Sequence, residues 1–354
     1  MMTSANTSKQ KNSGDEFGYL CVDDFIKTLV DARALATALE LRLVDYLIQN
    51  NEGSVDVIQG QFKGDSRGLR LLLDLLRFNN VLEEHEGRIK LTTQFKKALR
   101  YRDLLEAKIE FANFAAHDFI DFFTDLIANP PHFMQKADMF KLFSYGKCLE
   151  FTKENYDLTR RWMRYTTALT RYEAHVCMSR HDFSKYENML DIGGNSGEFA
   201  LQVCKKNPKI YATVFDLPLV CEIGQAHVRH EPEAGRISFF KGDALADPLP
   251  GTFDLITFKS VLHDWPDHEA KQFIRRAAGS LNPGGTLLIF ERGPFEIGGR
   301  QLPYSILPFL LFSHTFRSPV MYEEQLKSLG LTNILRENID LEMPFFILSA
   351  LSPQ

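Results

Sequence analysis

Apolar residues recur at intervals of three and four over the first hundred residues, which is the spacing of amphipathic helices. The stretch VDDFIKTLVDARALATALELRLVDYLIQ (22–49) keeps this spacing for several turns. Residues 54–93 then predict a short helix, a loop, a second helix at about 67–78, and two strands joined by a turn at His85–Gly87. This order of elements is that of a winged helix, and it predicts a helical unit over residues 18–100.

The next segment, 101–183, keeps the helical pattern and is interrupted at NPPHF (129–133). Its many aromatic residues belong to a core by default, although a subset could line one wall of an aromatic pocket. Trp162 and Tyr165 are the members of that set that we single out as candidate substrate contacts. We therefore expect a helical linker that also shapes a substrate pocket.

From residue 188 the pattern changes to short apolar runs that alternate with helical stretches. The apolar runs include NMLDI, YATVFD, ISFFK, FDLITFK and TLLIFER. Alternation of this kind is typical of a parallel α/β sheet with helices on both faces. The tail adds one more helix and closing strands, so residues 184–354 are predicted to form one Rossmann-like domain.

Composition and charge narrow the class of protein. The formal net charge of −5 gives no general attraction to nucleic acid or anionic membrane. The polar first seventeen residues are expected to be a disordered tail rather than a signal peptide, and the apolar run at 304–312 is too short to span a bilayer. We expect a cytoplasmic protein without membrane contact. The five scattered cysteines lack a C-x-x-C pair, which argues against a disulfide framework and a metal site.

A winged helix raises the alternative of a DNA-binding regulator. Residues 1–100 contain fourteen Lys and Arg against fourteen Asp and Glu, so there is no basic excess to neutralise phosphates. The recognition-helix equivalent, SRGLRLLLDLLRF (66–78), is apolar on more than one face, which suits burial against another helix or subunit. Dimerisation is therefore the favoured role of this unit.

The stretch LDIGGNSGEF (190–199) places Asp191 at the end of an apolar strand, before small residues and a helix. Because glycine has only a hydrogen atom as its side chain, the backbone at Gly193, Gly194 and Gly197 is free to approach a ligand closely and to take positive φ. The pattern G-G-x-x-G differs from the dinucleotide fingerprint, so a pyrophosphate cradle is not specified.

Two further aspartates follow the next two predicted strands. Asp216 in VFDLP is placed to accept hydrogen bonds from both ribose hydroxyls of an adenosine, and Asp243 lies in KGDAL. Each alone is more often a cap or turn residue. Because carboxyl ends of parallel strands meet at one crevice, the three aspartates and the glycine turn together favour a ligand site.

Several motifs now resemble those of the dimeric small-molecule O-methyltransferases: LDIGGNSGEFA, FDLP, FDLITFKSVLHDW, LNPGGTLLIFER and RSPVMYEEQLKSLGLTNI. The resemblance runs from about residue 20 to the end. It implies a Rossmann-like methyltransferase domain behind a winged-helix dimerisation domain, which completes the pocket of the partner in a homodimer. It also implies S-adenosylmethionine as cofactor, held by Asp191, Gly193, Gly194, Asn195, Ser196, Gly197, Asp216, Leu217, Asp243, Ala244 and Lys259.

His263 follows Lys259 by one turn and should emerge at the same sheet edge. A phenol near pKa 10 and a histidine near 6.5 differ by about 3.5 units, so prior proton transfer would cost on the order of 5 kcal/mol. A carboxylate on the other ring nitrogen would lower this cost, and the family carries a glutamate at Glu291 for that purpose. An ion pair of Glu291 with Arg292 is the alternative, and His268 is expected to be a solvated side chain.

Departures from the family pattern lie mostly on the acceptor side. Asn195 replaces a glycine and tolerates left-handed geometry. Phe316 stands where relatives carry a second glutamate, and Ser305 is the best match to a further acidic residue. The sequence thus predicts that the second carboxylate around His263 is missing, and His314 is a candidate for orienting the substrate.

These observations favour an S-adenosylmethionine-dependent O-methyltransferase of secondary metabolism, acting on an aromatic or polyketide-like hydroxyl with His263 as base and Glu291 behind it. The alternatives are N-, S- or C-methylation, a non-methylating enzyme of the same fold, and the DNA-binding regulator. Neither metal nor nucleic acid is expected as a partner.

Overall fold

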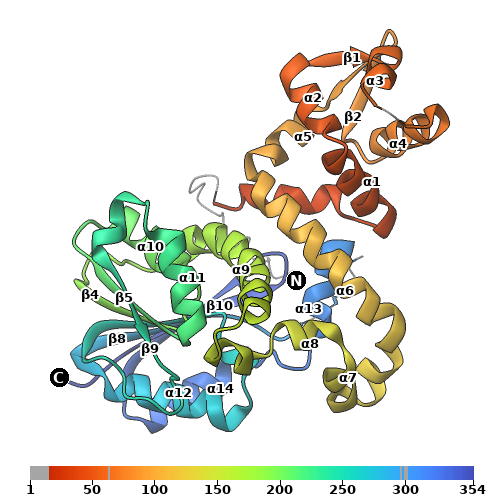
Figure 1. Cartoon of the computed structure of the whole chain (residues 1–354). Coiled ribbons are helices and arrows are strands. Elements are labelled where there is room, and N and C mark those ends of the chain that lie inside the picture. Colours follow the sequence, from red (N-terminus) through yellow and green to blue (C-terminus); the bar gives the residue numbers. More distant parts are fainter. Residues whose placement is uncertain (1–15, 63, 296, 299–301) are drawn as a thin grey trace, which may run out of the picture.

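The computed structural model describes residues 16–62, 64–295, 297–298 and 302–354 (Figure 1). An N-terminal helical unit lies at one end of the molecule, and a mixed α/β unit forms the other. Long helices run between them. The predicted tail over residues 1–17 falls almost wholly outside the described part.

The N-terminal unit contains a small antiparallel sheet in the order β1-β3-β2, with helices packed around it. Its elements are η1 (Gly18–Phe25), α1 (Leu29–Glu40), α2 (Leu43–Asn50), β1 (Glu52–Ser54), α3 (Val55–Gln61), α4 (Ser66–Phe78), β2 (Leu82–His85), β3 (Arg88–Leu91), α5 (Thr93–Ala98) and η2 (Leu99–Tyr101). The helix expected at 67–78 is α4, and the expected pair of strands is β2 and β3.

Helix α4 begins where Asp65 accepts a hydrogen bond from the Gly68 backbone at 2.7 Å, which satisfies a donor of the first turn. One face buries Leu69, Leu72, Leu73 and Leu76. Another face leaves Leu71 and Phe78 in solvent, with exposed fractions of 61 % and 90 %. The prediction of apolar residues on more than one face is therefore confirmed for this helix.

The middle segment joins the two units. It consists of α6 (Arg102–Ala128), α7 (Pro130–Lys136), α8 (Asp138–Leu142), η3 (Tyr145–Leu149) and α9 (Lys153–Arg180). Helix α6 ends at Asn129 because Pro130 and Pro131 cannot continue it, and they occupy the first turn of α7 instead. Helix α9 packs on α10 (Glu198–Lys206) beside the large sheet, which carries its side chains to the edge of that sheet (Figure 1).

The C-terminal unit is built on a seven-stranded sheet in the order β6-β5-β4-β7-β8-β10-β9. The first five of these strands run parallel, and β10 pairs antiparallel with both neighbours. The strands are β4 (Asn188–Ile192), β5 (Tyr211–Asp216), β6 (Ile237–Lys241), β7 (Phe253–Lys259), β8 (Leu281–Arg292), β9 (Thr332–Asp340) and β10 (Pro344–Leu351). Because the chain moves from β4 out to β6 and then returns to β7, the strand order reverses beside β4, where such sheets bind ligands.

Helices cover both faces of this sheet. Successive side chains of β8 are buried in two different apolar clusters, one on each face. Leu287 and Ile289 belong to one apolar cluster, whereas Leu288 and Phe290 belong to the other. The covering elements are α10, α11 (Pro218–Val228), η4 (Pro232–Arg236), η5 (Leu262–Asp264), α12 (Asp267–Gly279), η6 (Tyr304–Ile306), α13 (Leu307–Leu311) and α14 (Pro319–Ser328). The predicted α/β sheet with two covered faces is confirmed.

Among the described residues no helix is both long enough and apolar enough to cross a membrane. Four cysteines, namely Cys148, Cys177, Cys204 and Cys221, are buried, as expected for small apolar residues.

Candidate active site

The turn between β4 and α10 is held in a tight conformation. Gly193 and Gly197 have φ of 67° and 73°, and Asn195 has φ of 55°. Gly194, which is also free to take positive φ, does not do so. Gly194 is required for another reason, because a Cβ there would lie 2.6 Å from Asp191 Oδ2 and 2.9 Å from Val214 Cγ1.

Asp191 lies beneath this turn rather than in a cavity. Its side chain is 1 % exposed, and its Oδ1 accepts a hydrogen bond from Thr257 Oγ1 at 2.6 Å. Its Oδ2 is buried without a partner among the described residues. Burial raises the pKa of Asp191 to about 7. The carboxyl is therefore buried between Thr257 and the backbone of Gly194.

Asp216 ends β5 and turns its carboxylate toward the same loop. Oδ2 accepts the Asn195 backbone N–H at 2.8 Å, and Oδ1 accepts the Leu217 backbone N–H at 2.7 Å. Burial raises the pKa of Asp216 to about 6, although these two hydrogen bonds lower it. Each carboxylate oxygen has two lone pairs and accepts one of these hydrogen bonds, so one lone pair on each oxygen remains for a ligand.

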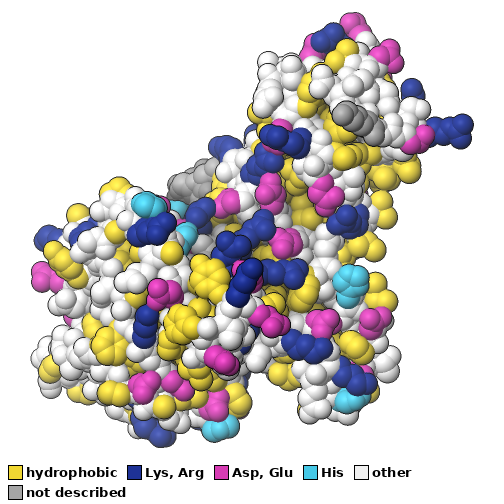
Figure 2. Space-filling model, in the orientation of Figure 1, with side chains coloured by type: hydrophobic (Ala, Val, Ile, Leu, Met, Phe, Trp, Pro, Cys, Tyr) yellow, Lys and Arg dark blue, Asp and Glu magenta, His cyan; other side chains and the backbone are white. Residues whose placement is uncertain are grey.

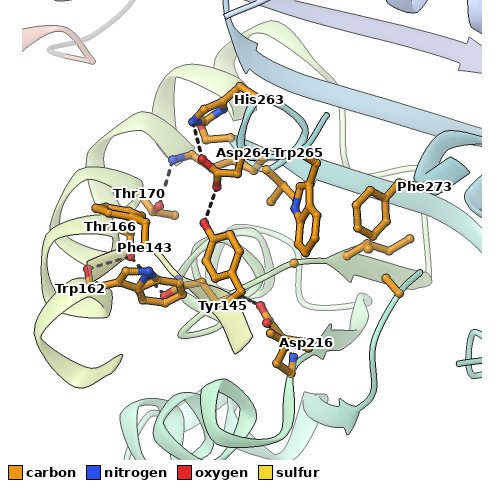
Figure 3. A pocket seen from close by; sticks show the side chains of 18 of the residues that line it. Phe143, Tyr145, Trp162, Thr166, Thr170, Asp216, His263, Asp264, Trp265 and Phe273 are labelled. Carbon is orange, nitrogen blue, oxygen red and sulfur yellow. Dashed lines mark hydrogen bonds and ion pairs between the residues drawn. The ribbon is translucent and has the colours of Figure 1, made fainter. Parts of the chain in front are cut away.

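A cavity with an empty volume of about 1150 Å³, its open mouth included, extends from this carboxylate to His263 (Figure 3). Of the predicted cofactor residues, those that line it are Gly193, Asn195, Asp216, Leu217, Asp243, Ala244 and Lys259. Gly194, Ser196 and Gly197 do not line it. Ser196 instead accepts a hydrogen bond from Thr167 Oγ1 at 2.7 Å, which ties the turn to α9.

His263 is paired with Glu291 as the sequence predicts. His263 Nδ1 lies 2.7 Å from Glu291 Oε1, and Glu291 also accepts the backbone N–H groups of Val261, Leu262 and Arg292 at 2.8–3.0 Å. Burial favours a neutral Glu291, but the neighbouring imidazole and these hydrogen bonds outweigh it, so the pKa of Glu291 lies below its ordinary range. The ionised carboxylate accepts a hydrogen bond from Nδ1 and so keeps a proton on that nitrogen. Nε2 is then the ring nitrogen that gains or loses a proton.

The prediction that a second carboxylate is missing around His263 was wrong. Asp264 Oδ1 lies 3.2 Å from His263 Nε2, and Asp264 Oδ2 accepts a hydrogen bond from Tyr145 Oη at 2.6 Å (Figure 3). The short turn η5 folds the side chain of Asp264 back over the imidazole of its neighbour, while Phe316 covers the ring with a centroid distance of 5.1 Å. The second carboxylate therefore comes from the adjacent residue.

The two carboxylates also set the charge of His263. Burial by itself lowers the pKa of His263, but the charges of Glu291 and Asp264 raise it further than burial lowers it. The result is a pKa above the ordinary value of a histidine. Burial raises the pKa of Asp264, against the opposing effects of His263 and the Tyr145 hydroxyl.

Lys259 lines the cavity, but its charge is already paired. Its Nζ forms an ion pair with Glu173 and donates to Thr170 Oγ1 at 2.9 Å. Arg292 Nη2 binds the other oxygen of Glu173 at 2.7 Å. The expected alternative, an ion pair of Arg292 with Glu291, is thus replaced by a pair with Glu173.

Sequence reasoning missed Tyr145, Glu173 and Asp264. The histidine–aspartate pair in the HDW motif could have pointed to Asp264. Neither Tyr145 nor Glu173 carries a local signal, because each meets its partner across more than eighty residues of chain.

Of the four predicted substrate residues, two line the cavity and two do not. Trp162 and Phe316 line the cavity. Tyr165 lies outside the lining, where it stacks on Phe111 and donates to Glu110 Oε1 at 2.8 Å. His314 is exposed, with Nε2 3.1 Å from Met134 Sδ. His268 is exposed to 78 %, in line with the expected solvated side chain.

Comparison with known families and known protein sequences gives three findings. Residues 132–301 match the family model described as O-methyltransferase domain. A human probable bifunctional dTTP/UTP pyrophosphatase/methyltransferase protein is 25 % identical over 76 % of this chain and 43 % of its own length. A 3-hydroxy-5-methyl-1-naphthoate 3-O-methyltransferase of Streptomyces sahachiroi is 33 % identical over 31 % of this chain and 32 % of its own length. The alignments thus span less than half of these two relatives.

Among solved structures, human N-acetylserotonin methyltransferase in complex with SAM superposes with a TM-score of 0.70 at 20 % identity. The match covers 91 % of this chain and 94 % of that one. At this identity the likeness shows a shared fold.

Proposed function

We propose that this protein, whose residues 132–301 match the family model described as O-methyltransferase domain, transfers a methyl group from S-adenosylmethionine to a hydroxyl of an aromatic or polyketide-like small molecule. The observation that carries the proposal is that Asp216 and His263 line one cavity. If Asp216 and His263 opened onto separate surfaces, the proposal would be ruled out.

The lining fits the cofactor. Gly193 lines the cavity with its backbone, and no side chain fits there, since a Cβ would meet Val261 at 2.8 Å. Asp216 keeps lone pairs for the two ribose hydroxyls, and Leu217, Asp243 and Ala244 lie beside it on the cavity wall. When bound, S-adenosylmethionine supplies a methyl group on a positively charged sulfur, which keeps the bonding electron pair after transfer.

His263 serves as the general base. Its Nε2 takes the proton of the acceptor hydroxyl while the acceptor oxygen forms its bond to the methyl carbon. The ionised Glu291 on Nδ1 stabilises the imidazolium that results, and it raises the pKa of His263 toward that of a phenol. Asp264 lies against the same nitrogen and gives the hydroxyl a second hydrogen-bond acceptor.

The other walls suit a flat apolar acceptor. Rings of Phe143, Trp162, Phe309, Phe312 and Phe316 line the cavity, and Phe316 packs against the imidazole of His263. Aromatic walls stack on planar rings and bury apolar area, which supports an aromatic acceptor.

The test is transfer of a tritiated methyl group from the cofactor to simple phenols and naphthols, with the product analysed for the methylated atom. His263→Ala should lower kcat at least a hundredfold, the usual contribution of a general base. His268→Ala is the matched control, because that imidazole is exposed on α12, and it should leave the rate unchanged. Full transfer by His263→Ala would remove the base assignment, and a product methylated on a ring carbon would favour C-methylation.

A homodimer is part of the proposal. The support is an apolar stripe along α6, in which Ile120, Phe123 and Ile127 are exposed to 72 %, 45 % and 70 %. Phe123 and Ile127 are four residues apart and share one face of the segment after the kink at Phe122, and Ile120 lies just before that kink. Figure 2 shows hydrophobic side chains gathered along α6 and beneath the N-terminal unit. Such exposed stripes mark association surfaces.

A further inference from the structure

Arg317 is a largely buried cation that the proposed mechanism does not use. It lies in the segment SHTFRS (313–318), and its side chain is 13 % exposed. The next residue, Ser318, caps α14: its Oγ accepts the Val320 backbone N–H at 3.4 Å, and Pro319 occupies the first turn of the helix. The backbone at Arg317 is therefore held at the start of a helix that packs against α12.

The guanidinium of Arg317 binds the turn that carries the proposed base. Its Nη1 donates a hydrogen bond to the Leu262 carbonyl oxygen at 2.8 Å, and its Nη2 donates to that of Trp265. These two carbonyls belong to the residues directly before and directly after the His263–Asp264 pair. Arg317 therefore holds the backbone on both sides of the two side chains that meet at Nε2.

The turn is weakly held by its own hydrogen bonds. The backbone hydrogen bonds within Val261–Trp265 measure 3.2 and 3.4 Å, which is longer than the usual N–H···O distance of about 2.9–3.0 Å. Glu291 accepts the two N–H groups at the start of the turn. Arg317 complements Glu291, because it binds carbonyl oxygens and reaches the end of the turn.

The position of the turn decides how Asp264 meets His263. Asp264 Oδ1 lies 3.2 Å from His263 Nε2, and Tyr145 holds the other carboxylate oxygen (Figure 3). A backbone shift of about 1 Å would break a contact of this length, and misplacement of that size can lower a rate about a hundredfold. The group that fixes the backbone here therefore bears on the reaction.

We propose that Arg317 is a positioning residue, which holds the backbone of η5 so that Asp264 stays against His263 Nε2. This inference rests on the proposed function, because it takes His263 as the base. Arg317 is not among the described residues that line the cavity, so its effect on the reaction passes through the turn.

The charge of His263 reports on this arrangement. The groups whose charges act most on its imidazole are Glu291, Asp264 and Arg292. The carboxylate of Asp264 raises the pKa of His263, so displacement of Asp264 should lower that pKa. Removal of the cation at Arg317 would by its charge alone raise the pKa. The direction of the change thus separates displacement of the turn from loss of charge.

The test is the pKa of the His263 imidazole, measured by NMR titration of the protein with ring-labelled histidine, with His263→Gln used to assign the signal. Arg317→Gln should lower this pKa by about one unit, because Asp264 moves away with the turn. Asp264→Asn should lower it by a similar amount. The two substitutions combined should lower it no further than Asp264→Asn alone, since both act through one contact.

Asp267→Ala is the matched control. Arg317 Nε donates to Asp267 Oδ1 at 2.5 Å, but this carboxylate is 69 % exposed, so the ion pair contributes little. The variant keeps both carbonyl contacts of Arg317 and should keep the native pKa of His263. Urea unfolding shows whether each variant is folded. If Arg317→Gln is not, Arg317→Lys is titrated in its place and should give a smaller fall in the same direction.

An unchanged or raised pKa of His263 in the folded Arg317 variant, or an equal fall in Asp267→Ala, would overturn the inference. Transfer of labelled methyl groups is scored separately. Arg317→Gln should lower kcat at least about tenfold and change KM for S-adenosylmethionine less than about twofold, since the turn lies at the base and not at Asp216. A fall in the pKa without transfer to any phenol would retain the role of Arg317 in the turn and refute the proposed function, whereas transfer without that fall would retain the proposed function alone.

Discussion

At the scale of single residues, Glu291 is the best-anchored group of the site. It is fully buried, and three backbone N–H groups hold it against His263. An ionised carboxylate at this position makes the imidazolium more stable, so the rate of transfer should rise with pH through a midpoint above that of an ordinary histidine. Below that midpoint His263 is protonated and unable to accept the acceptor proton.

Glu291→Gln removes this charge while keeping the size of the side chain. We expect the acidic limb of the pH–rate profile to move down by about one to three units and the plateau to fall at least tenfold, because the base is then weaker. Steady-state rates between pH 5 and 9 measure both effects, and thermal unfolding of the variant checks that it is folded. A limb that stays in place would contradict the role of Glu291.

Asp216 predicts a second pH dependence, in cofactor binding. Its pKa of about 6 before binding lies above the ordinary range because of burial. The ionised form accepts the ribose hydroxyls better, so affinity for S-adenosylhomocysteine should be constant above this pKa and fall up to tenfold per pH unit below it.

Calorimetry between pH 5 and 8 measures this slope. Asp216→Asn should bind at least about tenfold more weakly at pH 8, since a charge-assisted hydrogen bond contributes about 1.5–3 kcal/mol. It should also lose most of the slope, which separates Asp216 from Asp191, whose pKa of about 7 is close by. A flat profile for the native protein would count against the ribose assignment.

At the scale of elements, the turn between β4 and α10 determines the shape of the cofactor end. Its backbone passes within van der Waals distance of Asp191, whose carboxylate cannot retreat without losing its hydrogen bond to Thr257. Gly194→Ala should therefore destabilise the protein by about 1–3 kcal/mol and weaken S-adenosylhomocysteine binding more than tenfold. Urea unfolding and calorimetry measure the two quantities.

Gly60→Ala is the matched control for this prediction. Gly60 lies inside α3, and a Cβ there meets no atom within 4 Å. The same substitution should stabilise that helix by up to about 1 kcal/mol and leave cofactor binding unchanged. Equal behaviour of the two alanine variants would show that steric fit at Gly194 is unimportant.

At the scale of the whole molecule, the exposed stripe on α6 predicts self-association. Sedimentation velocity at micromolar concentration should show a dimer, and Ile127→Glu should shift it toward monomer by placing a charge in an apolar interface. Leu335→Glu is the control, because Leu335 on β9 is also exposed, to 68 %, but stands apart from the stripe. A native monomer, or equal effects of both variants, would remove α6 from the interface.

The amino-acid sequence by itself determined the order of elements and the cofactor end of the cavity. The last residues of β4 and β5, with Asp191 and Asp216 among them, and the glycine turn after β4 are encoded in short stretches, because periodicity and backbone freedom are local properties. Parallel strands then bring their carboxyl ends to one edge, so even the meeting of Asp216 with His263 follows from local patterns.

Only the tertiary structure decided the surroundings of the base and the acceptor wall. Trp162 and Tyr165 lie three residues apart on α9, yet Trp162 lines the cavity and Tyr165 lies outside it. Asp264 faces His263 because Tyr145, 119 residues earlier in the chain, holds its other oxygen. The direction in which a side chain points depends on the packing of helices from distant segments, and this is a property of the folded chain rather than of any window of its sequence.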